Sequence, residues 1–120
     1  MKILVIDDEE MIRSMATKIL ERGGYEVIGA ASGLDGLNLV RSDDDIGCVI
    51  LDLTMPGMSG EETLKEIRSG HADLPCLLSS GQPVDVKAMG EELAINTDFL
   101  EKPYRASTLI EAVKRITEKA

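Results

Sequence analysis

The residues of this sequence best suited to chemistry are three aspartates that follow short apolar runs. Asp7 and Asp8 come directly after the run at residues 3–6. Asp52 comes directly after the run at residues 48–51. Three converging carboxylates repel one another, so a pocket built from them needs a cation. A hard divalent ion with oxygen ligands and retained waters suits such a pocket, and Mg²⁺ is the first choice, with Mn²⁺ as the alternative.

A hydroxyl and an ammonium follow two further apolar runs. Ser80 stands shortly after the run at residues 76–78, and Lys102 stands shortly after the run at residues 99–100. A carboxylate, a divalent metal, a hydroxyl and a lysine form a constellation suited to phosphoryl transfer, in which the carboxylate attacks phosphorus in line. The metal and the lysine would neutralise charge on the equatorial oxygens. No residue of this set is specific alone, and their joint placement points to the chemistry.

The apolar runs alternate five times with amphipathic stretches. They lie at residues 3–6, 25–28, 48–51, 76–78 and 99–100. Three of them are near-continuously apolar, which is typical of strands buried on both faces of a parallel sheet. Strands and helices alternating at this spacing predict right-handed βαβ units. The predicted fold is therefore α/β and doubly wound, (βα)5, with a five-stranded parallel sheet and helices on both faces.

Five helices are predicted between and after these strands. Gly23 and Gly24 end the first helix, and Ser59 with Glu62 forms a capping box at the start of the third. Gly90 lies in the middle of the fourth and weakens it by up to ~1 kcal/mol. The fifth begins at about Arg105. The apolar stripes are Met11, Met15 and Ile19 with Ile12, Ala16 and Leu20 beside them; Leu34, Leu37 and Val40; Val86, Met89 and Leu93; and Leu109, Val113 and Ile116.

The predicted topology brings the chemical residues together. In a doubly wound sheet, ligands bind outside the carboxyl ends of the strands, at the point where the strand order reverses. With the strand order 2-1-3-4-5, strands one and three are neighbours at that point. The three aspartates would then crowd into one pocket, with the hydroxyl and the ammonium at the same rim.

Composition and charge restrict the function classes. The 120 residues are 43% hydrophobic and 29% charged, which predicts a single globular domain over residues 1–120. No apolar run approaches the roughly 18–20 residues of a membrane span, and no leader segment is evident, so a cytoplasmic location without membrane contact is expected. The net charge of −9 disfavours direct nucleic-acid binding. Cys48 and Cys76 are interpreted as buried, reduced core thiols.

Over essentially its whole length, the sequence resembles the response-regulator receiver domains of two-component signal transduction, of the flavodoxin-like, chemotaxis-regulator type. The resemblance implies a flavodoxin-like fold made of one receiver domain, residues 1–120. A Leu-Leu-Ser-Ser-Gly-Gln run is also similar to receivers that are part of hybrid sensor kinases. The matching motifs are Asp7-Asp8 after Ile-Leu-Val-Ile, Asp52 in Leu-Asp-Leu-Thr-Met-Pro-Gly-Met-Ser-Gly, Ser80-Gly81 and Lys102-Pro103.

The resemblance implies specific site roles. Asp52 would accept a phosphoryl group from the phosphohistidine of a sensor histidine kinase or of a histidine phosphotransfer protein. Mg²⁺ would be held directly by Asp8 and Asp52, by Asp7 through water, and by the backbone carbonyl of Thr54. The chain would not otherwise be an enzyme, because only its own Mg²⁺-dependent phosphorylation and dephosphorylation are implied.

The resemblance also implies a switch. Ser80 takes the place of the family's switching hydroxyl, Phe99 that of its switching aromatic, and Lys102–Pro103 is implied to be a cis peptide. Phosphorylation would remodel the surface made by the fourth helix, the fifth strand and the fifth helix. Output would pass through a downstream protein or through a domain outside this sequence, and the chain would be a monomer or a weak, phosphorylation-dependent dimer.

Departures from the family pattern are modest. Ile95-Asn96 stands where a Gly-Ala pair is usual. Thr54 and Gln82 occupy the two positions that tune dephosphorylation in the family, and neither predicts a lifetime for the phosphorylated state.

Each site residue also has an ordinary structural reading. A lone strand-end Asp52 would most often cap a turn, and Asp8 could cap the first helix. Ser80 could be a small strand-end residue, Lys102 a surface lysine, and Pro103 an ordinary trans proline that opens the last helix.

Three further residues are read mainly as structural. Phe99 could be an ordinary core residue. His71 is favoured as a surface or helix-end histidine rather than a phospho-acceptor. Met55 and Met58, in the turn after the third apolar run, are interpreted as loop packing, with partner contact as the alternative.

Two other function classes compete with the phospho-switch. A phosphorylation-independent interaction module would keep the fold without the switch, and the intact acidic triad argues against it. A phosphotransferase of the haloacid dehalogenase type would need a second aspartate two residues after Asp52, where the chain has Thr54. A Gly-x-x-x-x-Gly-Lys phosphate loop is also missing from the sequence.

Overall fold

A computed structural model describes residues 1–118. Five parallel strands form one sheet in the order β2-β1-β3-β4-β5, which confirms the predicted fold class and strand order. The elements are β1 (Lys2–Ile6), α1 (Glu10–Arg22), β2 (Glu26–Ala30), α2 (Gly33–Ser42), β3 (Ile46–Asp52), α3 (Gly60–Gly70), β4 (Cys76–Ser80), the 3₁₀ helix η1 (Val86–Met89), α4 (Glu91–Ala94), β5 (Thr97–Glu101) and α5 (Ala106–Glu118).

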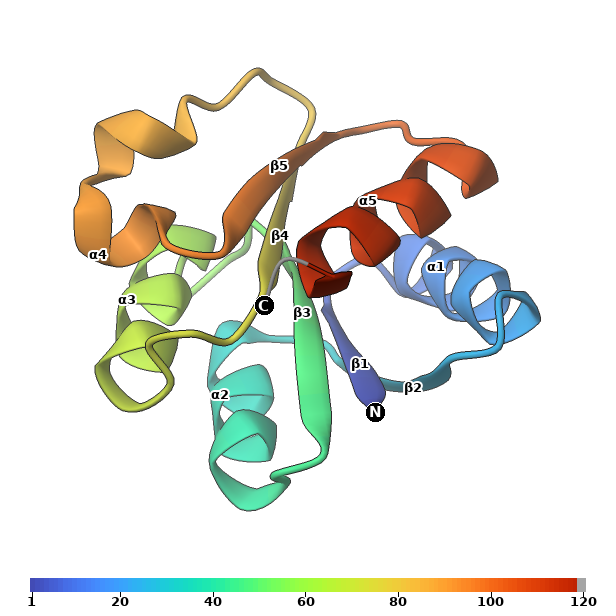
Figure 1. The fold of residues 1–120 in the computed structure, drawn as a ribbon, viewed down its shortest axis with the longest axis horizontal. Coiled ribbons are helices and arrows are strands. Elements are labelled where there is room, and N and C mark those ends of the chain that lie inside the picture. The colour runs from blue at the N-terminus through green and yellow to red at the C-terminus, as the bar shows by residue number, and fades with distance from the viewer. Residues whose placement is uncertain (119–120) are drawn as a thin grey trace.

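Helices cover both faces of the sheet. Figure 1 shows α1 and α5 side by side on one face, with α2, α3 and α4 on the other. Alternate residues of each strand point into different cores. In β1, Ile3 and Val5 pack against α1 and α5, whereas Leu4 and Ile6 pack against α2 and α3. Burial on both faces explains why the strands read as continuous apolar runs.

The start of α3 is fixed next to the end of β3. The Ser59 hydroxyl accepts a hydrogen bond from the Glu62 N–H at 3.2 Å, and the Glu62 carboxylate accepts one from the Ser59 N–H at 3.4 Å. The predicted capping box is therefore confirmed. Gly60 follows it, and any Cβ at this position would collide with the backbone carbonyl of Asp52. Glycine thus lets the first turn of α3 lie against the residue that ends β3.

The stripe predicted on α1 is partly wrong. Ala16 and Leu20 are buried as expected, but Met11 is 85% exposed and Met15 is 41% exposed. The two stripes are neighbours on the helix; Ala16 and Leu20 lie in the core between the sheet and α5, and of the other stripe only Ile19 packs against that core. Leu34, predicted on the core stripe of α2, is also exposed. Isolated apolar side chains on a surface are common, so periodicity alone did not separate them from the core.

The fourth predicted helix is also not continuous. Gly90 adopts a φ of 98°, which lies outside the helical region, and divides the segment into η1 and the four-residue α4. Glycine reaches this conformation without a Cβ penalty, so the break occurs where the weakness was predicted. The fifth helix agrees with its prediction, because Leu109, Val113 and Ile116 are all buried.

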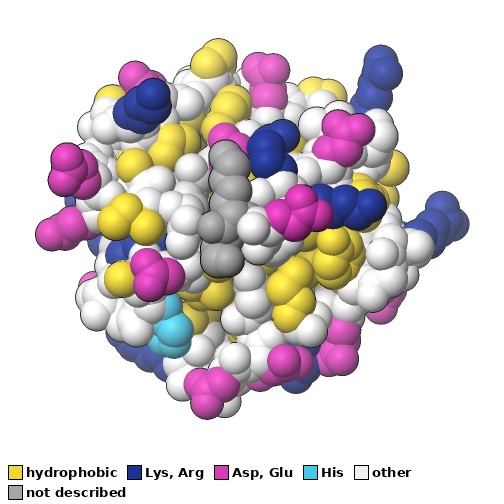
Figure 2. Space-filling model, in the orientation of Figure 1, with side chains coloured by type: hydrophobic (Ala, Val, Ile, Leu, Met, Phe, Trp, Pro, Cys, Tyr) yellow, Lys and Arg dark blue, Asp and Glu magenta, His cyan; other side chains and the backbone are white. Residues whose placement is uncertain are grey.

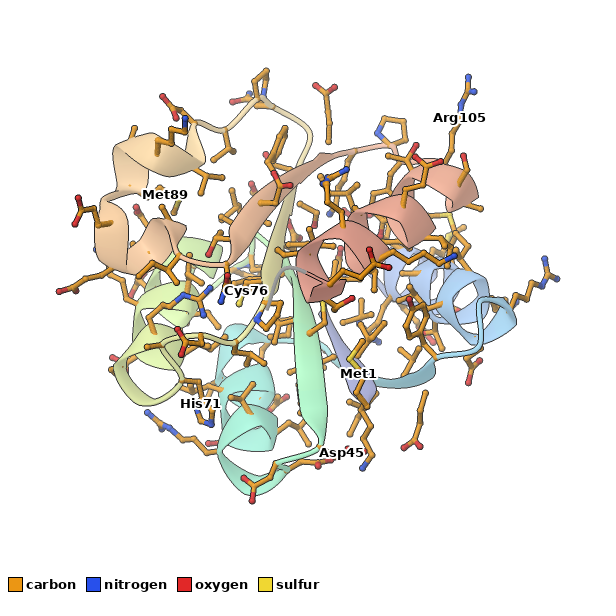
Figure 3. The ribbon with its side chains drawn as sticks, viewed as in Figure 1. Met1, Asp45, His71, Cys76, Met89 and Arg105 are labelled. Atoms are coloured by element: carbon orange, nitrogen blue, oxygen red, sulfur yellow. The ribbon has the colours of Figure 1, made fainter. Side chains whose placement is uncertain are left out.

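The cysteines, His71 and the surface charges can be seen in Figures 2 and 3. Cys76, labelled inside the fold in Figure 3, and Cys48 are buried free thiols as predicted. His71 is the C-cap residue of α3, is half-buried, and is labelled in the lower left of Figure 3. Acidic and basic side chains are interspersed on the face shown in Figure 2, without a continuous basic surface. Among residues 1–118, none of the helices is both long enough and apolar enough to cross a membrane.

Candidate functional site

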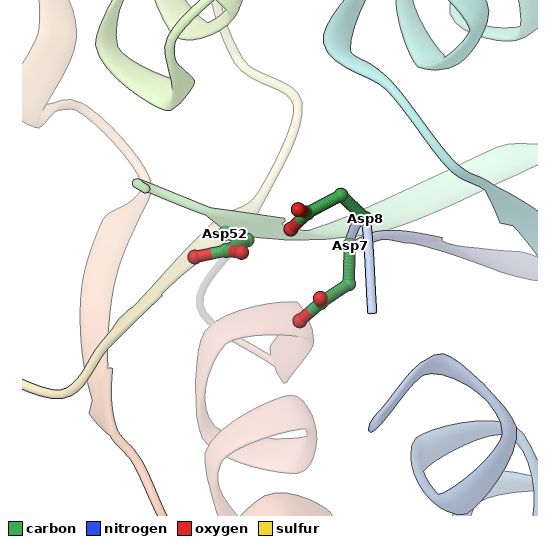
Figure 4. Close-up of side chains that lie close together, drawn as sticks. All are labelled: Asp7, Asp8 and Asp52. Atoms are coloured by element: carbon green, nitrogen blue, oxygen red, sulfur yellow. The ribbon is translucent and has the colours of Figure 1, made fainter. Parts of the chain in front are cut away.

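Three carboxylates meet at the C-terminal edge of the sheet. Asp7 and Asp8 follow β1, and Asp52 is the last residue of β3, the strand that pairs with β1. One oxygen from each carboxylate lies within 4.8 Å of the other two. Figure 4 shows the three side chains projecting into the same space. The structure therefore brings together the acidic residues singled out from the sequence.

The three carboxylates differ in exposure. Asp7 and Asp52 are each only 3% exposed, whereas Asp8 is exposed. Burial raises the pKa of Asp52, and the charge of Asp7 adds to the effect. The Thr54 N–H and Lys102 act in the opposite direction without cancelling it. The site therefore holds an aspartate whose negative charge is only partly compensated.

Asp7 is held from several sides. Its Oδ1 accepts a hydrogen bond from the Glu9 N–H at 2.9 Å, and its Oδ2 accepts one from Lys102 Nζ at 2.9 Å. Its own N–H donates to the Ala30 carbonyl at 3.1 Å.

The N-cap of α1 is Glu9, without a side-chain capping bond, so Asp8 does not cap the first helix.

Lys102 reaches the same pocket from the end of β5. Its Nζ lies 2.9 Å from Asp7 Oδ2 and 3.4 Å from Asp52 Oδ1. Its backbone N–H donates to the Ser80 carbonyl at 2.8 Å, which ties the two strand ends together. Burial alone would lower the pKa of Lys102, but the hydrogen bond to Asp7 and the two carboxylate charges raise it overall. Lys102 is thus a charged pocket residue and not a free surface lysine.

Asp52 and Ser80 are oriented by turns of the same kind. Asp52 Oδ1 accepts a hydrogen bond from the Thr54 N–H at 3.0 Å, and Ser80 Oγ accepts one from the Gln82 N–H at 3.1 Å. Ser79, which precedes Ser80, is the β-sheet partner of Asp52. The hydroxyl therefore lies at the end of the strand adjacent to the one that carries Asp52, and it is largely buried.

The other residues singled out from the sequence lie around this pocket. Thr54 is exposed, next to the end of β3. Phe99 is half-buried in the middle of β5 and belongs to neither buried core cluster. The Lys102–Pro103 peptide is cis, as the resemblance implied. Met55 is buried in the core beneath α2 and α3, which agrees with the loop-packing interpretation.

Two residues near the pocket were not singled out from the sequence. Tyr104 is 8% exposed, and burial, followed by the charges of Asp7 and Asp52, raises its pKa to about 12. Its position directly after Lys102-Pro103 was the available signal. Arg13 donates from Nη1 to the Asp7 carbonyl at 2.7 Å. In the sequence it is an ordinary polar position of an amphipathic helix, so no pattern marked it.

The donor set fits a hard divalent cation. Carboxylate oxygens are the ligands that Mg²⁺ takes in proteins, usually one or two of them together with waters. Among residues 1–118, Lys102 makes the only salt bridges to these three carboxylates, so their negative charge is incompletely balanced. The exposed side of Asp8 leaves room for the waters that Mg²⁺ keeps.

Comparison with known proteins places this site in a family. A family model described as the response regulator receiver domain matches residues 3–114. Sensor kinase CckA of Brucella abortus is 31% identical over 118 residues, which cover 98% of this chain and 12% of that protein. Transcriptional regulatory protein CpxR of Escherichia coli K12 is 33% identical over 120 residues, 99% of this chain and 50% of that protein. The chain thus spans half or less of these curated relatives.

Solved structures agree with the sequence comparisons. Chemotaxis protein CheY4 of Vibrio cholerae superposes with a TM-score of 0.87 at 31% identity, covering 96% of this chain and 97% of that one. The receiver domain from hybrid histidine kinase CckA gives a TM-score of 0.81 at 32% identity, covering 98% and 99%. The likeness extends over nearly the whole of both chains in each case.

Proposed function

The chain belongs to the response regulator receiver family of two-component systems, and on that premise we propose that Asp52 accepts a phosphoryl group from a partner's phosphohistidine. The observation that carries the proposal is the placement of Asp52. Its carboxylate is nearly buried at the end of β3, within 4.8 Å of two further carboxylates and 3.4 Å from the Lys102 ammonium. This is the environment that an in-line attack on phosphorus requires.

In this reaction, an Asp52 oxygen forms a new bond to phosphorus while the bond between phosphorus and the donor's histidine nitrogen breaks. Asp52 Oδ1 is already engaged by the Thr54 N–H and Lys102, so Oδ2 is the better placed nucleophile. Lys102 faces the charge that develops on the phosphoryl oxygens. Bound Mg²⁺ would neutralise part of the same charge, and Asp7, Asp8, Asp52 and the Thr54 carbonyl would hold it.

Phosphorylation would then act as a switch. The acyl phosphate offers new oxygen acceptors to the Ser80 hydroxyl, which now accepts from the Gln82 N–H. Movement of Ser80 would alter the loop that leads to η1 and let Phe99 turn inward. The surface of α4, β5 and α5 would change as a shift between two populated states, driven by contacts that only the phosphorylated state makes.

The relatives suggest the partners. One is named as a sensor kinase and another as a transcriptional regulatory protein, and this chain matches part of each. We therefore propose a sensor histidine kinase or histidine phosphotransfer protein as donor, and a downstream protein or an attached domain as output. Residues 1–120 would act as a single cytoplasmic receiver domain, monomeric or weakly dimeric when phosphorylated, with no enzymatic activity beyond its own phosphorylation and dephosphorylation. It would contact neither nucleic acid nor membrane directly.

Intact-protein mass spectrometry tests this proposal. The protein is incubated with acetyl phosphate, with and without Mg²⁺, as wild type, Asp52→Asn and the matched control Asp45→Asn at the opposite end of β3. We expect one Mg²⁺-dependent phosphoryl adduct on the wild type and the control, and none on Asp52→Asn. Equal labelling of Asp52→Asn would refute the assignment, and an unlabelled wild type would favour the phosphorylation-independent interaction module.

A further inference from the structure

Arg13 contacts the acidic pocket through its backbone. The side chain leaves the beginning of α1, and Nη1 donates to the carbonyl of Asp7 at 2.7 Å. This carbonyl belongs to the peptide group that joins Asp7 to Asp8. A charged donor on the carbonyl fixes the plane of that peptide, and the plane sets the direction in which the Asp8 side chain leaves the backbone.

Asp8 depends on this peptide more than its neighbours do. The Asp7 carboxylate is held by the Glu9 N–H and by Lys102. The Asp52 carboxylate is held by the Thr54 N–H and Lys102. Asp8 is exposed, and no salt bridge to another residue of the described range 1–118 restrains its side chain. Its orientation toward the other two carboxylates therefore comes from the backbone.

The neighbouring strand leaves a gap for the Arg13 side chain. A Cβ added to Gly29 of β2 would lie 3.2 Å from Cδ and 3.4 Å from Cγ of Arg13. These separations are shorter than a comfortable carbon–carbon contact. The aliphatic part of Arg13 thus lies across the glycine, and Gly29 permits the path that brings the guanidinium to Asp7. This observation is independent of the hydrogen bond and points to the same role.

We propose that Arg13 is a positioning residue of the cation site: it holds the Asp7–Asp8 peptide so that the Asp8 carboxylate faces Asp7 and Asp52. The inference rests on the proposed function, because it concerns the same cation site. Removal of the Arg13 side chain would affect Mg²⁺ affinity in opposite directions through its charge and through its positioning role. A nearby cation repels a divalent ion, so simple charge removal would tighten Mg²⁺ binding, whereas loss of positioning weakens it.

The test is Mg²⁺ affinity measured by isothermal titration calorimetry on Arg13→Met. Methionine keeps an unbranched side chain over Gly29 and a good helix propensity but removes the donor. We expect binding about tenfold weaker, the effect of losing one charge-assisted hydrogen bond. The matched control is Lys18→Met, an exposed cation on the same helix, for which affinity should stay within about twofold at moderate salt. Unchanged or tighter binding by Arg13→Met, or an equal loss in the control, would overturn the proposal.

Gly29→Ala provides a second variant that keeps every charge. The added methyl would lie 3.2 Å from Arg13 Cδ, so the Arg13 side chain must move by a few tenths of an ångström and its hydrogen bond to Asp7 is strained. Alanine in place of glycine also reduces the entropy lost on folding. We expect weaker Mg²⁺ binding here too, with an unchanged circular dichroism spectrum, and wild-type affinity would overturn the proposal. If the wild type binds Mg²⁺ and both variants match it, only the role of Arg13 fails. If the wild type itself binds no Mg²⁺, the proposed function fails as well.

Discussion

Replacing Asp52 by asparagine should stabilise the protein when Mg²⁺ is absent. Asp52 is 3% exposed, and burial together with the charge of Asp7 raises its pKa. Its ionised form is therefore less stable in the folded protein than in the unfolded chain. Asparagine removes the charge, and its side-chain carbonyl can still accept the hydrogen bond that the Thr54 N–H now donates to Asp52.

The distances set the size of the effect. At an effective dielectric constant of about 20, each of the two carboxylates within 4.8 Å repels Asp52 by about 3.5 kcal/mol. Lys102 Nζ at 3.4 Å attracts it by about 5 kcal/mol. Because Asp8 is exposed, solvent screens its share of the repulsion, and the attraction by Lys102 then nearly cancels the repulsion that remains. The desolvation of the buried Asp52 charge, the largest cause of its raised pKa, therefore decides the sign. We expect the free energy of unfolding of Asp52→Asn to exceed that of the wild type by about 1–2 kcal/mol.

Urea unfolding in the presence of a chelator measures this difference. A raised pKa means that the cost of the Asp52 charge is absent below the pKa of an unfolded aspartate and appears as the pH rises through the higher folded pKa. The difference in the free energy of unfolding between Asp52→Asn and the wild type should therefore be present at neutral pH and vanish below about pH 4. It should also become smaller when Mg²⁺ is added, because the ion stabilises the wild-type carboxylates. Asp45→Asn, which changes the same charge outside the pocket, is the control. A metal-free Asp52→Asn protein less stable than wild type at neutral pH would refute the reasoning.

Three further predictions concern the pocket and its support. Lys102→Met leaves the buried Asp7 carboxylate without its cation and should lower the free energy of unfolding by about 2 kcal/mol, measured in urea with chelator. Addition of Mg²⁺ should restore part of the lost stability. Ser59→Ala removes the capping box and should cost about 1 kcal/mol in the same assay. Burial raises the pKa of Tyr104 to about 12, so wild-type stability should decline as the pH rises from about 10 toward 12, more steeply than in Tyr104→Phe.

Each of these predictions has an outcome that would contradict it. An undiminished stability of Lys102→Met would mean that Asp7 does not depend on the ammonium. A Ser59→Ala protein as stable as wild type would show that α3 needs no side-chain cap. Parallel alkaline profiles for wild type and Tyr104→Phe would show that the phenol is not buried in its neutral form.

Much of the fold could be predicted because local signals and tertiary structure agree. Strands buried on both faces appear as apolar runs, and their parallel order places Asp7, Asp52 and Lys102 at one edge. The capping box of Ser59 and Glu62 depends on residues only three apart, so it is visible in the sequence.

The sequence predictions are wrong or incomplete for residues whose burial or conformation depends on tertiary contacts. Met11 and Ala16 lie on adjacent stripes of one helix, and only the position of the sheet and α5 determines which is buried. The sequence predicts that Gly90 weakens the fourth helix, but not that Gly90 takes a φ of 98° and ends one helix before the next begins. The contact of Arg13 with Asp7 joins two segments through space, and no spacing in the sequence encodes it. Tyr104 follows Lys102-Pro103 directly, which places it near the pocket, but its burial depends on tertiary packing.

The assignment of Asp52 as the phospho-acceptor can be tested most directly by locating the modified residue. Protein treated with acetyl phosphate and Mg²⁺ is reduced with borohydride, which converts an aspartyl phosphate to homoserine, and the peptides are then sequenced by tandem mass spectrometry. We predict homoserine at position 52, only when both the phosphodonor and Mg²⁺ were present. Homoserine at position 7 or 8, or its absence from position 52 in a sample that carries a phosphoryl adduct, would contradict the proposed mechanism.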